Sequence, residues 1–259
     1  MADDLTLLTD AARRAGDIAL GHFKAEPKTW DKPGNAGPVT EADLAVDAML
    51  RQSLLAERPD YGWLSEETED SPERLSAERL FIVDPIDGTR AFIEGNSGWA
   101  HSLAIAENGR IIAAVVYLPV SDRIYSAALG QGAFLNGERI HASGRENLEQ
   151  ATLLAARPVF DAWNWQGGTP PPLTREFRSS LAYRMSLVGQ GRFDAMLTLR
   201  ATWEWDIAAG ALIVAEAGGI ASDRRMQPLR FNNPHPQVNG VLAAGAPLHP
   251  LLGARLSQA

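Results

Sequence analysis

The sequence predicts an α+β protein whose second half is α/β, and three observations support this. Apolar residues recur at three- and four-residue steps over 5–19, the spacing of one face of a helix. Short apolar runs alternate with tight turns over 100–140, which is typical of an antiparallel meander covered by helices. After residue 156, helical and strand-like stretches alternate, as in α/β proteins. We therefore divide the chain into residues 1–149 and 150–259.

The elements of the first half follow from local signals. A loop rich in Pro and Gly over 26–38 precedes a second helix over about 41–57, for which Thr40 is a suitable N-cap. Residues 61–64 and 80–83 predict two strands joined by an acidic connection. In the meander, two Asn-Gly dipeptides, at 108–109 and 136–137, predict two-residue hairpin turns, where the backbone needs positive φ.

The second half begins with a segment that regular structure cannot occupy. Prolines and glycines are dense over 156–172, which excludes a continuous helix or strand. Beyond it, helical and strand-like stretches alternate over 174–180, 185–191 and 193–199. A strong helix over 206–217 is closed by Gly218-Gly219.

Composition excludes several classes of protein. The 259 residues carry 24 Lys and Arg against 32 Asp and Glu, and the formal net charge of −8 disfavours binding of nucleic acid polymers. No cysteine is present, which excludes disulfide scaffolds and thiolate sites. No signal-peptide pattern is visible, and the most apolar run, over 111–120, is too short to cross a membrane. We expect a cytoplasmic protein.

The most informative stretch reads Asp84-Pro85-Ile86-Asp87-Gly88-Thr89. Pro85 cannot continue a ladder of hydrogen bonds, so we expect the strand to turn there and to leave both Asp residues at a sheet edge. Their carboxylates and the Ile86 carbonyl are hard oxygen ligands of the kind that Mg²⁺ takes. The last two residues open a predicted short helix, whose first amides favour a phosphate. The alternative is an Asp that only caps a strand-to-helix turn.

Other acidic positions are ambiguous from the residues alone. Glu66-Glu67 is either a solvated turn or, at the end of a strand beside the Asp84 motif, the source of a third acidic ligand. Asp206 either caps the helix that follows or lies as a carboxylate against two tryptophans. Asp43 either forms a capping pair with Thr40 or orients a hydroxyl near a metal site. Zinc-ligand spacing, Walker-type phosphate loops and Gly-x-Ser-x-Gly elbows are absent from the sequence.

Together these segments resemble the inositol monophosphatase-like superfamily of Mg²⁺-dependent, lithium-sensitive phosphomonoesterases. The matching pieces, in the family's order, are Val39-Thr40 with Asp43, Glu66-Glu67, Asp84 to Thr89, and Trp205-Asp206 followed by Ala217-Gly218-Gly219. The resemblance implies a layered α-β-α-β-α sandwich with metal ions between its halves. Members of the family are commonly dimers, so a homodimer is expected.

The resemblance also implies ligands for two or three Mg²⁺ ions. Glu66, Asp84 and the Ile86 carbonyl would hold the first ion. Asp84, Asp87 and Asp206 would hold the second. Two metal ions of this kind clamp the attacking and leaving oxygens of an in-line displacement, so no side-chain nucleophile is needed.

The remaining matching residues are implied to bind substrate or position water. The amides of Gly88 and Thr89 would hold the phosphate, with Asp87 and Asp206 also contacting substrate. Thr89, paired with Asp43, would position the attacking water together with Glu66. Glu67 and Lys32, the latter on a loop near the metal ions, would support these ligands from behind.

Within the superfamily, the chain is most similar to bacterial 3'(2'),5'-bisphosphate nucleotidases, which act on 3'-phosphoadenosine 5'-phosphate. The similarity lies in Leu64-Ser65 before the Glu pair, a basic residue after Thr89, and Ser179-Ser180-Leu181. Arg90-Ala91 and Arg178 depart from that branch, which has Lys-Glu and Gly there. Arg90 and Arg184 are candidates to meet a second phosphate, and Trp163-Asn164-Trp165 is a candidate to flank adenine.

Three alternatives stay open. Inositol monophosphate is the second candidate substrate, and histidinol phosphate and fructose bisphosphate are further candidates. A protein that keeps the phosphatase fold but only binds a partner is disfavoured, because every expected metal carboxylate is intact. A Ca²⁺-stabilised domain lacks the dense ligand loop that such sites use.

Overall fold

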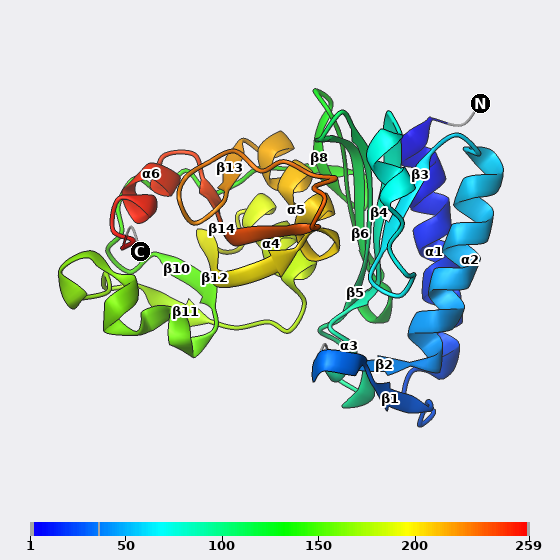
Figure 1. Cartoon of the computed structure of the whole chain (residues 1–259). Coiled ribbons are helices and arrows are strands. Elements are labelled where there is room, and N and C mark those ends of the chain that lie inside the picture. The colour runs from blue at the N-terminus through cyan, green and yellow to red at the C-terminus, as the bar shows by residue number, and fades with distance from the viewer. Residues whose placement is uncertain (1–2, 36, 258–259) are drawn as a thin grey trace.

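Helices and sheets alternate in layers in the computed structural model, which describes residues 3–35 and 37–257 (Figure 1). The α-helices of the described residues are α1 (Asp4–His22), α2 (Glu41–Glu57), α3 (Thr89–Ile93), α4 (Leu181–Gly189), α5 (Glu204–Glu216) and α6 (Leu248–Gly253). No helix among these residues has the length and apolar character needed to cross a membrane.

A seven-stranded sheet forms the first half of the chain. Its strands, in spatial order, are β3 (Gly62–Ser65), β4 (Arg79–Asp87), β5 (Ala100–Glu107), β6 (Arg110–Leu118), β7 (Arg123–Ala128), β8 (Gly132–Leu135) and β9 (Glu138–Ile140). β3 and β4 are parallel, and from β4 onward every neighbouring pair is antiparallel, as the meander predicts. The predicted hairpin turns are confirmed, since Asn108, Gly109, Asn136 and Gly137 all have positive φ.

A five-stranded sheet lies in the second half. Its spatial order is β11 (Thr174–Glu176), β10 (Thr152–Ala155), β12 (Ala195–Trp203), β14 (Gln237–Gly245) and β13 (Gly219–Ser222). β10 is parallel to both of its neighbours, whereas β14 is antiparallel to β12 and β13. The segment rich in Pro and Gly before β11 contains only short 3₁₀ turns, in agreement with the prediction.

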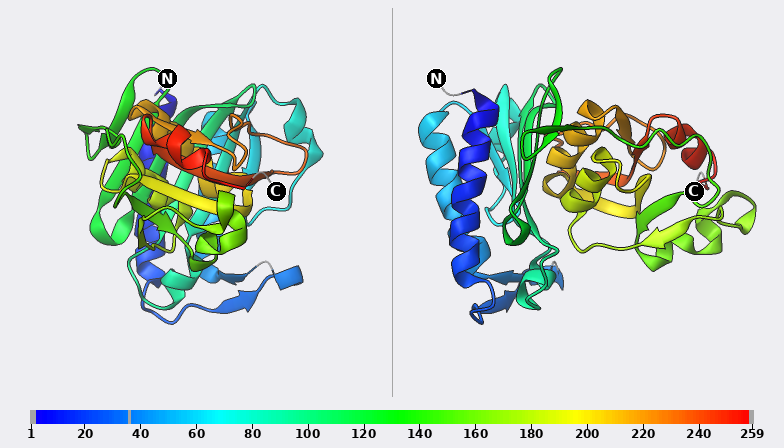
Figure 2. Two further views of the ribbon diagram at one scale, coloured as in Figure 1. Left: turned by 90° about the vertical axis from the view of Figure 1, so that its left-hand side faces the viewer. Right: turned by 180° about the vertical axis from the view of Figure 1, so that it is seen from behind.

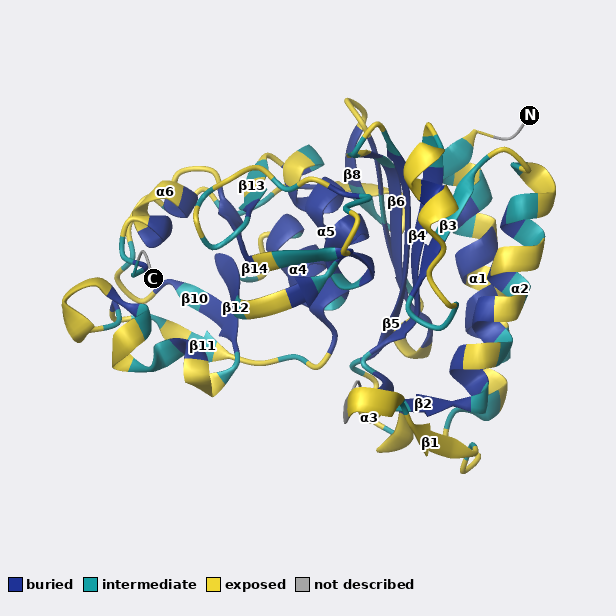
Figure 3. Ribbon diagram, viewed as in Figure 1, coloured by how far each residue is buried: buried dark blue, intermediate teal, exposed yellow. Residues whose placement is uncertain are grey.

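The layers give the predicted α-β-α-β-α sandwich. α1 and α2 cover one face of the seven-stranded sheet, while α4 and α5 lie between the two sheets (Figure 2). α6 packs with β10, β12 and β14 on the far side of the second sheet. Figure 3 shows the buried strands β4, β5 and β6 enclosed by these helices.

The prediction that the chain turns at Pro85 is wrong. β4 continues to Asp87, because a β-bulge between Asp84 and Asp87 places two residues opposite the single residue His101 of β5. A bulge accommodates the missing proline N–H, and the ring of buried His101 contacts the Pro85 carbonyl through Nδ1. β4 also has a neighbour on each side, so the motif lies at the end of an inner strand instead of at a sheet edge.

A separate hairpin lies beside the end of the first sheet. β1 (Thr29–Asp31) and β2 (Pro38–Thr40) pair in antiparallel fashion and lead directly into α2. Thr40 is the N-cap of that helix, as predicted. The hairpin lies beside α3 (Figure 1).

Candidate active site

Three carboxylates from three different elements meet in one place. Glu66 follows β3, Asp84 lies in β4, and Asp206 lies in the first turn of α5. One oxygen from each lies within 4.8 Å of the others, an arrangement that could hold a metal ion. Residues separated by up to 140 positions in the sequence are thus brought together.

Local pairing explains this convergence. β3 runs parallel to β4 with Ser65 opposite Val83, and the Glu66 amide donates a hydrogen bond to the Val83 carbonyl at 3.2 Å. Glu66 is therefore placed beside Asp84 by the register of the sheet. The first turn of α5 is tied to β5, because the Ser102 hydroxyl donates to the carbonyl of Trp205 at 3.0 Å.

One carboxylate of this cluster, Asp84, lacks a donor that would normally compensate burial. Asp84 is 1% exposed, and its Oδ1 has no hydrogen-bond partner among the described residues. Burial raises the pKa of Asp84 well above its ordinary value, and the charges of Glu66, Asp87 and Asp206 raise it further. Burial likewise raises the pKa of Asp206 well above its ordinary value. Hard oxygens that repel one another and lack protein donors fit a divalent cation.

Asp87 lies beside the cluster and is anchored differently. Its Oδ2 accepts hydrogen bonds from the Ser180 hydroxyl and the Ala182 amide, both at 2.7 Å. Burial raises the pKa of Asp87 to about 6, although these hydrogen bonds oppose the shift. Ser180 is the N-cap of α4, so Asp87 links the two halves of the chain. Ser180 had no predicted role in the site, although a serine directly before an apolar helix is a capping signal.

Asp43 performs both of the functions that the sequence left open. It forms a capping box with Thr40 at the start of α2, and its Oδ1 accepts a hydrogen bond from the Thr89 hydroxyl at 3.2 Å. Burial raises the pKa of Asp43, whereas the hydrogen bonds from Thr40 lower it. The Thr89 hydroxyl also lies 3.2 Å from the Ile86 carbonyl. Both Asp43 and Thr89 are buried, so this pair is held in place by α2 and α3.

The turn before α3 depends on glycine. Gly88 is the N-cap residue of α3 and has φ of +103°, a region that side chains with a Cβ rarely adopt. A Cβ there would lie 3.3 Å from both the Gly98 carbonyl oxygen and the Trp99 Cα. The predicted helix start is confirmed, and Gly88 and Thr89 line the same cavity as Glu66, Asp87 and Asp206.

Lys32 provides the positive charge nearest the cluster. Its Nζ lies 2.7 Å from Glu66 Oε1 and 2.7 Å from Glu67 Oε1. Burial lowers the pKa of Lys32, but the charges and hydrogen bonds of the two glutamates raise it overall. Burial and the charge of Glu66 raise the pKa of Glu67 to about 7. The loop between β1 and β2 therefore places a cation on the outer side of the carboxylates.

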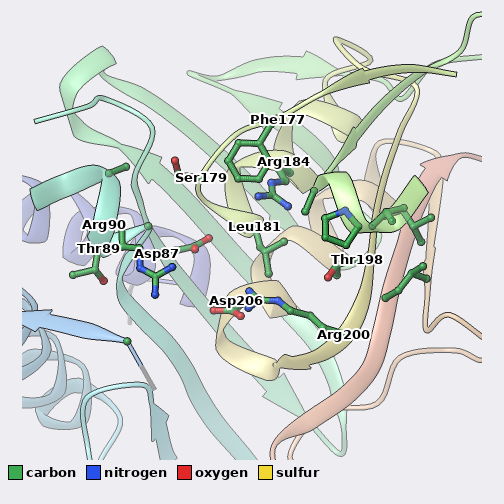
Figure 4. Close-up of a pocket in the computed structure, with 18 of the residues that line it drawn as sticks. Asp87, Thr89, Arg90, Phe177, Ser179, Leu181, Arg184, Thr198, Arg200 and Asp206 are labelled. Carbon is green, nitrogen blue, oxygen red and sulfur yellow. The ribbon is translucent and has the colours of Figure 1, made fainter. Parts of the chain in front are cut away.

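A cavity of about 900 Å³ opens in front of these residues. Glu66, Asp87, Thr89 and Asp206 line one side of it. The opposite side is formed by the second half of the chain, with Phe177, Ser179, Leu181, Arg184, Thr198 and Arg200 (Figure 4). This volume is near the upper end of the range for small-molecule sites.

Two details of α5 differ from the sequence prediction. Trp203 is the N-cap, so Asp206 is the third helical residue and does not cap the helix. Glu204, which sequence analysis did not assign, is fully buried and accepts hydrogen bonds from the amides of Asn232 and Asn233 at 2.6 and 2.9 Å. Its partners lie 28 and 29 residues further along, so no local signal could have identified it. Glu204 fixes the helix start from which Asp206 projects.

Comparisons with known proteins agree with this architecture. The model of the inositol monophosphatase family matches residues 2–258. Over 234 residues the chain is 35% identical to an inositol-1-monophosphatase of Rhizobium meliloti, and the match covers 85% of each chain. It is 34% identical over 234 residues to the Nus factor SuhB of Pseudomonas aeruginosa, covering 85% of this chain and 84% of that protein.

A solved structure shows the same arrangement in three dimensions. The IMPase of Thermotoga maritima superimposes with a TM-score of 0.82 at 29% sequence identity. The match covers 97% of this chain and 96% of that one. The similarity therefore includes both sheets and the helices between them.

Proposed function

The chain belongs to the inositol monophosphatase family of phosphatases, and from this premise we propose that it is a Mg²⁺-dependent phosphomonoesterase. The observation that carries the proposal is the convergence of Glu66, Asp84 and Asp206 within 4.8 Å, beside the cavity. The buried Asp84 oxygen without a protein donor supports a cation there.

The proposed ligands are those implied by the sequence. Glu66, Asp84 and the Ile86 carbonyl would hold one ion, and Asp84, Asp87 and Asp206 would hold a second; a third ion is also open. Bound divalent cations supply charge neutralisation at the phosphate and lower the pKa of water. Because Asp87 Oδ2 is engaged by Ser180 and Ala182, its Oδ1 is the oxygen left to face an ion.

The chain's own residues would orient the attacking water. The Thr89 hydroxyl donates a hydrogen bond to Asp43 or to the Ile86 carbonyl, so the lone pairs of its oxygen can accept a hydrogen bond from water. Glu66 would accept a hydrogen bond from the other O–H group of that water. Lys32 and Glu67 would hold Glu66 in position, and the amides of Gly88 and Thr89 would bind the phosphate oxygens.

The substrate we propose first is 3'-phosphoadenosine 5'-phosphate. The cavity supports this choice, because it has room beyond a phosphate and carries exposed aromatic side chains, Trp163 and Phe177, that could contact a base. Inositol 1-phosphate is the second candidate, favoured by the names of the relatives. A cytoplasmic location, lithium inhibition and a homodimer stay predictions.

Release of inorganic phosphate from a panel of esters tests the proposal. The panel contains 3'-phosphoadenosine 5'-phosphate, inositol 1-phosphate, histidinol phosphate and fructose 1,6-bisphosphate, each with Mg²⁺ and with a chelator. We expect Mg²⁺-dependent hydrolysis, with the highest kcat/KM for the first ester. A higher kcat/KM for inositol 1-phosphate would reverse the substrate order. Absence of turnover on every ester would favour a protein that keeps the phosphatase fold to bind a partner.

A further inference from the structure

The cavity wall opposite the carboxylates carries positive charge that the reaction does not use. Arg184 in α4 and Arg200 in β12 both line the cavity (Figure 4). Neither forms an ion pair with any carboxylate of residues 3–35 and 37–257. Two guanidinium groups without carboxylate partners, in a cavity of this size, require an explanation.

Arg184 is a buried cation held in a fixed orientation. It is 6% exposed, its Nε donates a hydrogen bond to the Arg178 carbonyl at 2.5 Å, and its guanidinium lies 4.4 Å from the ring centre of Phe177. Among the described residues its terminal nitrogens have no hydrogen-bond partner. Burial lowers the pKa of Arg184 to about 10, so the group stays charged at neutral pH. Burying such a charge without an anion is unfavourable.

Arg200 reaches the cavity because of a second β-bulge. Between Thr198 and Ala201, β12 has two residues, Leu199 and Arg200, opposite the single residue Gly240 of β14. Gly240 has φ of +69°, and a Cβ there would lie 2.6 Å from the Thr198 carbonyl oxygen. The bulge therefore depends on glycine, and it directs Arg200 toward Asp206 in Figure 4.

Charge balance points to an anion between the two guanidinium groups. The negative charges of Asp87 and Asp206 now favour the charged form of Arg184, whereas Arg200 opposes it. Cations bound at the carboxylates would neutralise these negative charges, leaving the opposite wall with two arginines. A planar guanidinium binds phosphate through two N–H groups, and Arg184 and Arg200 would present such groups to one anion.

We propose that Arg184 and Arg200 form a subsite for a second phosphate of the substrate, so that esters with two phosphate groups are preferred over the corresponding monophosphates. This inference rests on the proposed phosphatase function. The ester to be cleaved lies at the carboxylates, while the second phosphate lies between α4 and the bulge of β12. Phe177 holds the Arg184 guanidinium by stacking, which makes Arg184 and Arg200 specificity-determining residues.

A matched pair of substrates tests the subsite. The kcat/KM for 3'-phosphoadenosine 5'-phosphate and for adenosine 3'-phosphate is measured with Mg²⁺ for the unaltered chain, Arg200→Ala and Arg184→Lys. Loss of one charge-assisted contact should lower kcat/KM for the bisphosphate on the order of tenfold to a hundredfold. The value for the monophosphate should change by no more than about twofold. Arg110→Ala, an exposed residue at the start of β6 and outside the residues that line the cavity, controls for the loss of one positive charge.

Binding measurements separate this inference from the proposed function. Calorimetry compares the affinity for adenosine 5'-phosphate, which retains the second phosphate, between the unaltered chain and Arg200→Ala. We expect weaker binding to Arg200→Ala, even if no ester is hydrolysed. Equal loss of kcat/KM on both esters, or equal affinity of both proteins for adenosine 5'-phosphate, would overturn the subsite. Because Arg200 is exposed, its variant remains informative if Arg184→Lys fails to fold.

Discussion

Two buried acidic centres in this molecule are built in opposite ways. In the candidate active site, Asp84 has an oxygen without a donor and faces Glu66 and Asp206. Asp194, just before β12, accepts hydrogen bonds from the Ser143 hydroxyl at 2.6 Å and from the Thr152 amide and hydroxyl, both at 2.8 Å. Burial alone would raise the pKa of Asp194, but these donors and the charge of Arg145 lower it overall.

The difference separates a structural carboxylate from one that requires a ligand. Asp194 is satisfied by the protein and connects the segment after β9 to β10 and β12. The pKa of Asp84 is raised, because burial and neighbouring negative charges are not compensated by donors. A bound divalent cation or protonation of the carboxyl would compensate them. Substitution should therefore change stability in opposite directions at the two centres, and only the centre at Asp84 should respond to metal ions.

Asp84→Asn is expected to give the largest effect. It removes an oxygen shared by both proposed ions, so phosphate release should fall by more than the roughly 10–100-fold typical for loss of an outer partner of a metal ligand. Without metal, the Tm should stay the same or rise, because a repelling charge is gone. Circular dichroism and a phosphate-release assay measure the two quantities. Near-normal turnover in a folded Asp84→Asn or Asp87→Asn protein would refute the assignment of these ligands.

Asp194→Asn should change stability instead of chemistry. The amide cannot accept hydrogen bonds at both positions that the carboxylate occupies, so the free energy of unfolding should fall by about 1–3 kcal/mol. The rise in Tm on adding Mg²⁺ should match that of the unaltered chain, since Asp194 is not part of the cluster. Urea denaturation measures the free energy of unfolding, and thermal unfolding with and without Mg²⁺ measures the rise in Tm. A variant that kept its stability but lost its response to Mg²⁺ would remove the distinction between the two centres.

The sequence predicted the active centre better than the structural one, for a physical reason. Asp84, Asp87 and Gly88 belong to one contiguous motif whose oxygens and turn geometry are recognisable locally. The donors to Asp194 lie 42 and 51 positions away, and neither a serine in a loop nor a threonine at the start of a strand indicates its long-range partner. A structural acid whose hydrogen-bond donors lie far away in the sequence therefore cannot be recognised before the fold is known.

The two β-bulges also differ in how far the sequence predicts them. Pro85 marks an interruption in β4, but its position alone does not distinguish a turn from a bulge, and the turn predicted there is wrong. The bulge at Arg200 is marked in the sequence only by a glycine on the partner strand, Gly240, which has positive φ. Arg184 was singled out from the sequence, yet its burial against Phe177 depends on tertiary packing. Helix starts were more predictable, although Asp206 falls two residues inside its helix.

The pH dependence of metal binding gives the smallest effect and compares the two centres directly. Mg²⁺ needs charged carboxylates, and Asp87 has a pKa raised to about 6, with those of Asp84 and Asp206 also raised. Below this pH protons compete with the ion, so Mg²⁺ affinity should fall as pH falls, by up to about tenfold per unit for each displaced proton. Metal-free protein should show the reverse at this site, because the protonated carboxyls stabilise the fold. For Asp87 that contribution is lost as pH rises through about 6. Asp194 has a lowered pKa, so its contribution is lost only as pH falls below its unfolded value of about 4.

The Mg²⁺-induced rise in Tm, measured from about pH 5 to pH 8, should therefore grow with pH in the unaltered chain and in Asp194→Asn alike. A rise in Tm that stays constant over this range would mean that Mg²⁺ does not bind at the raised-pKa carboxylates.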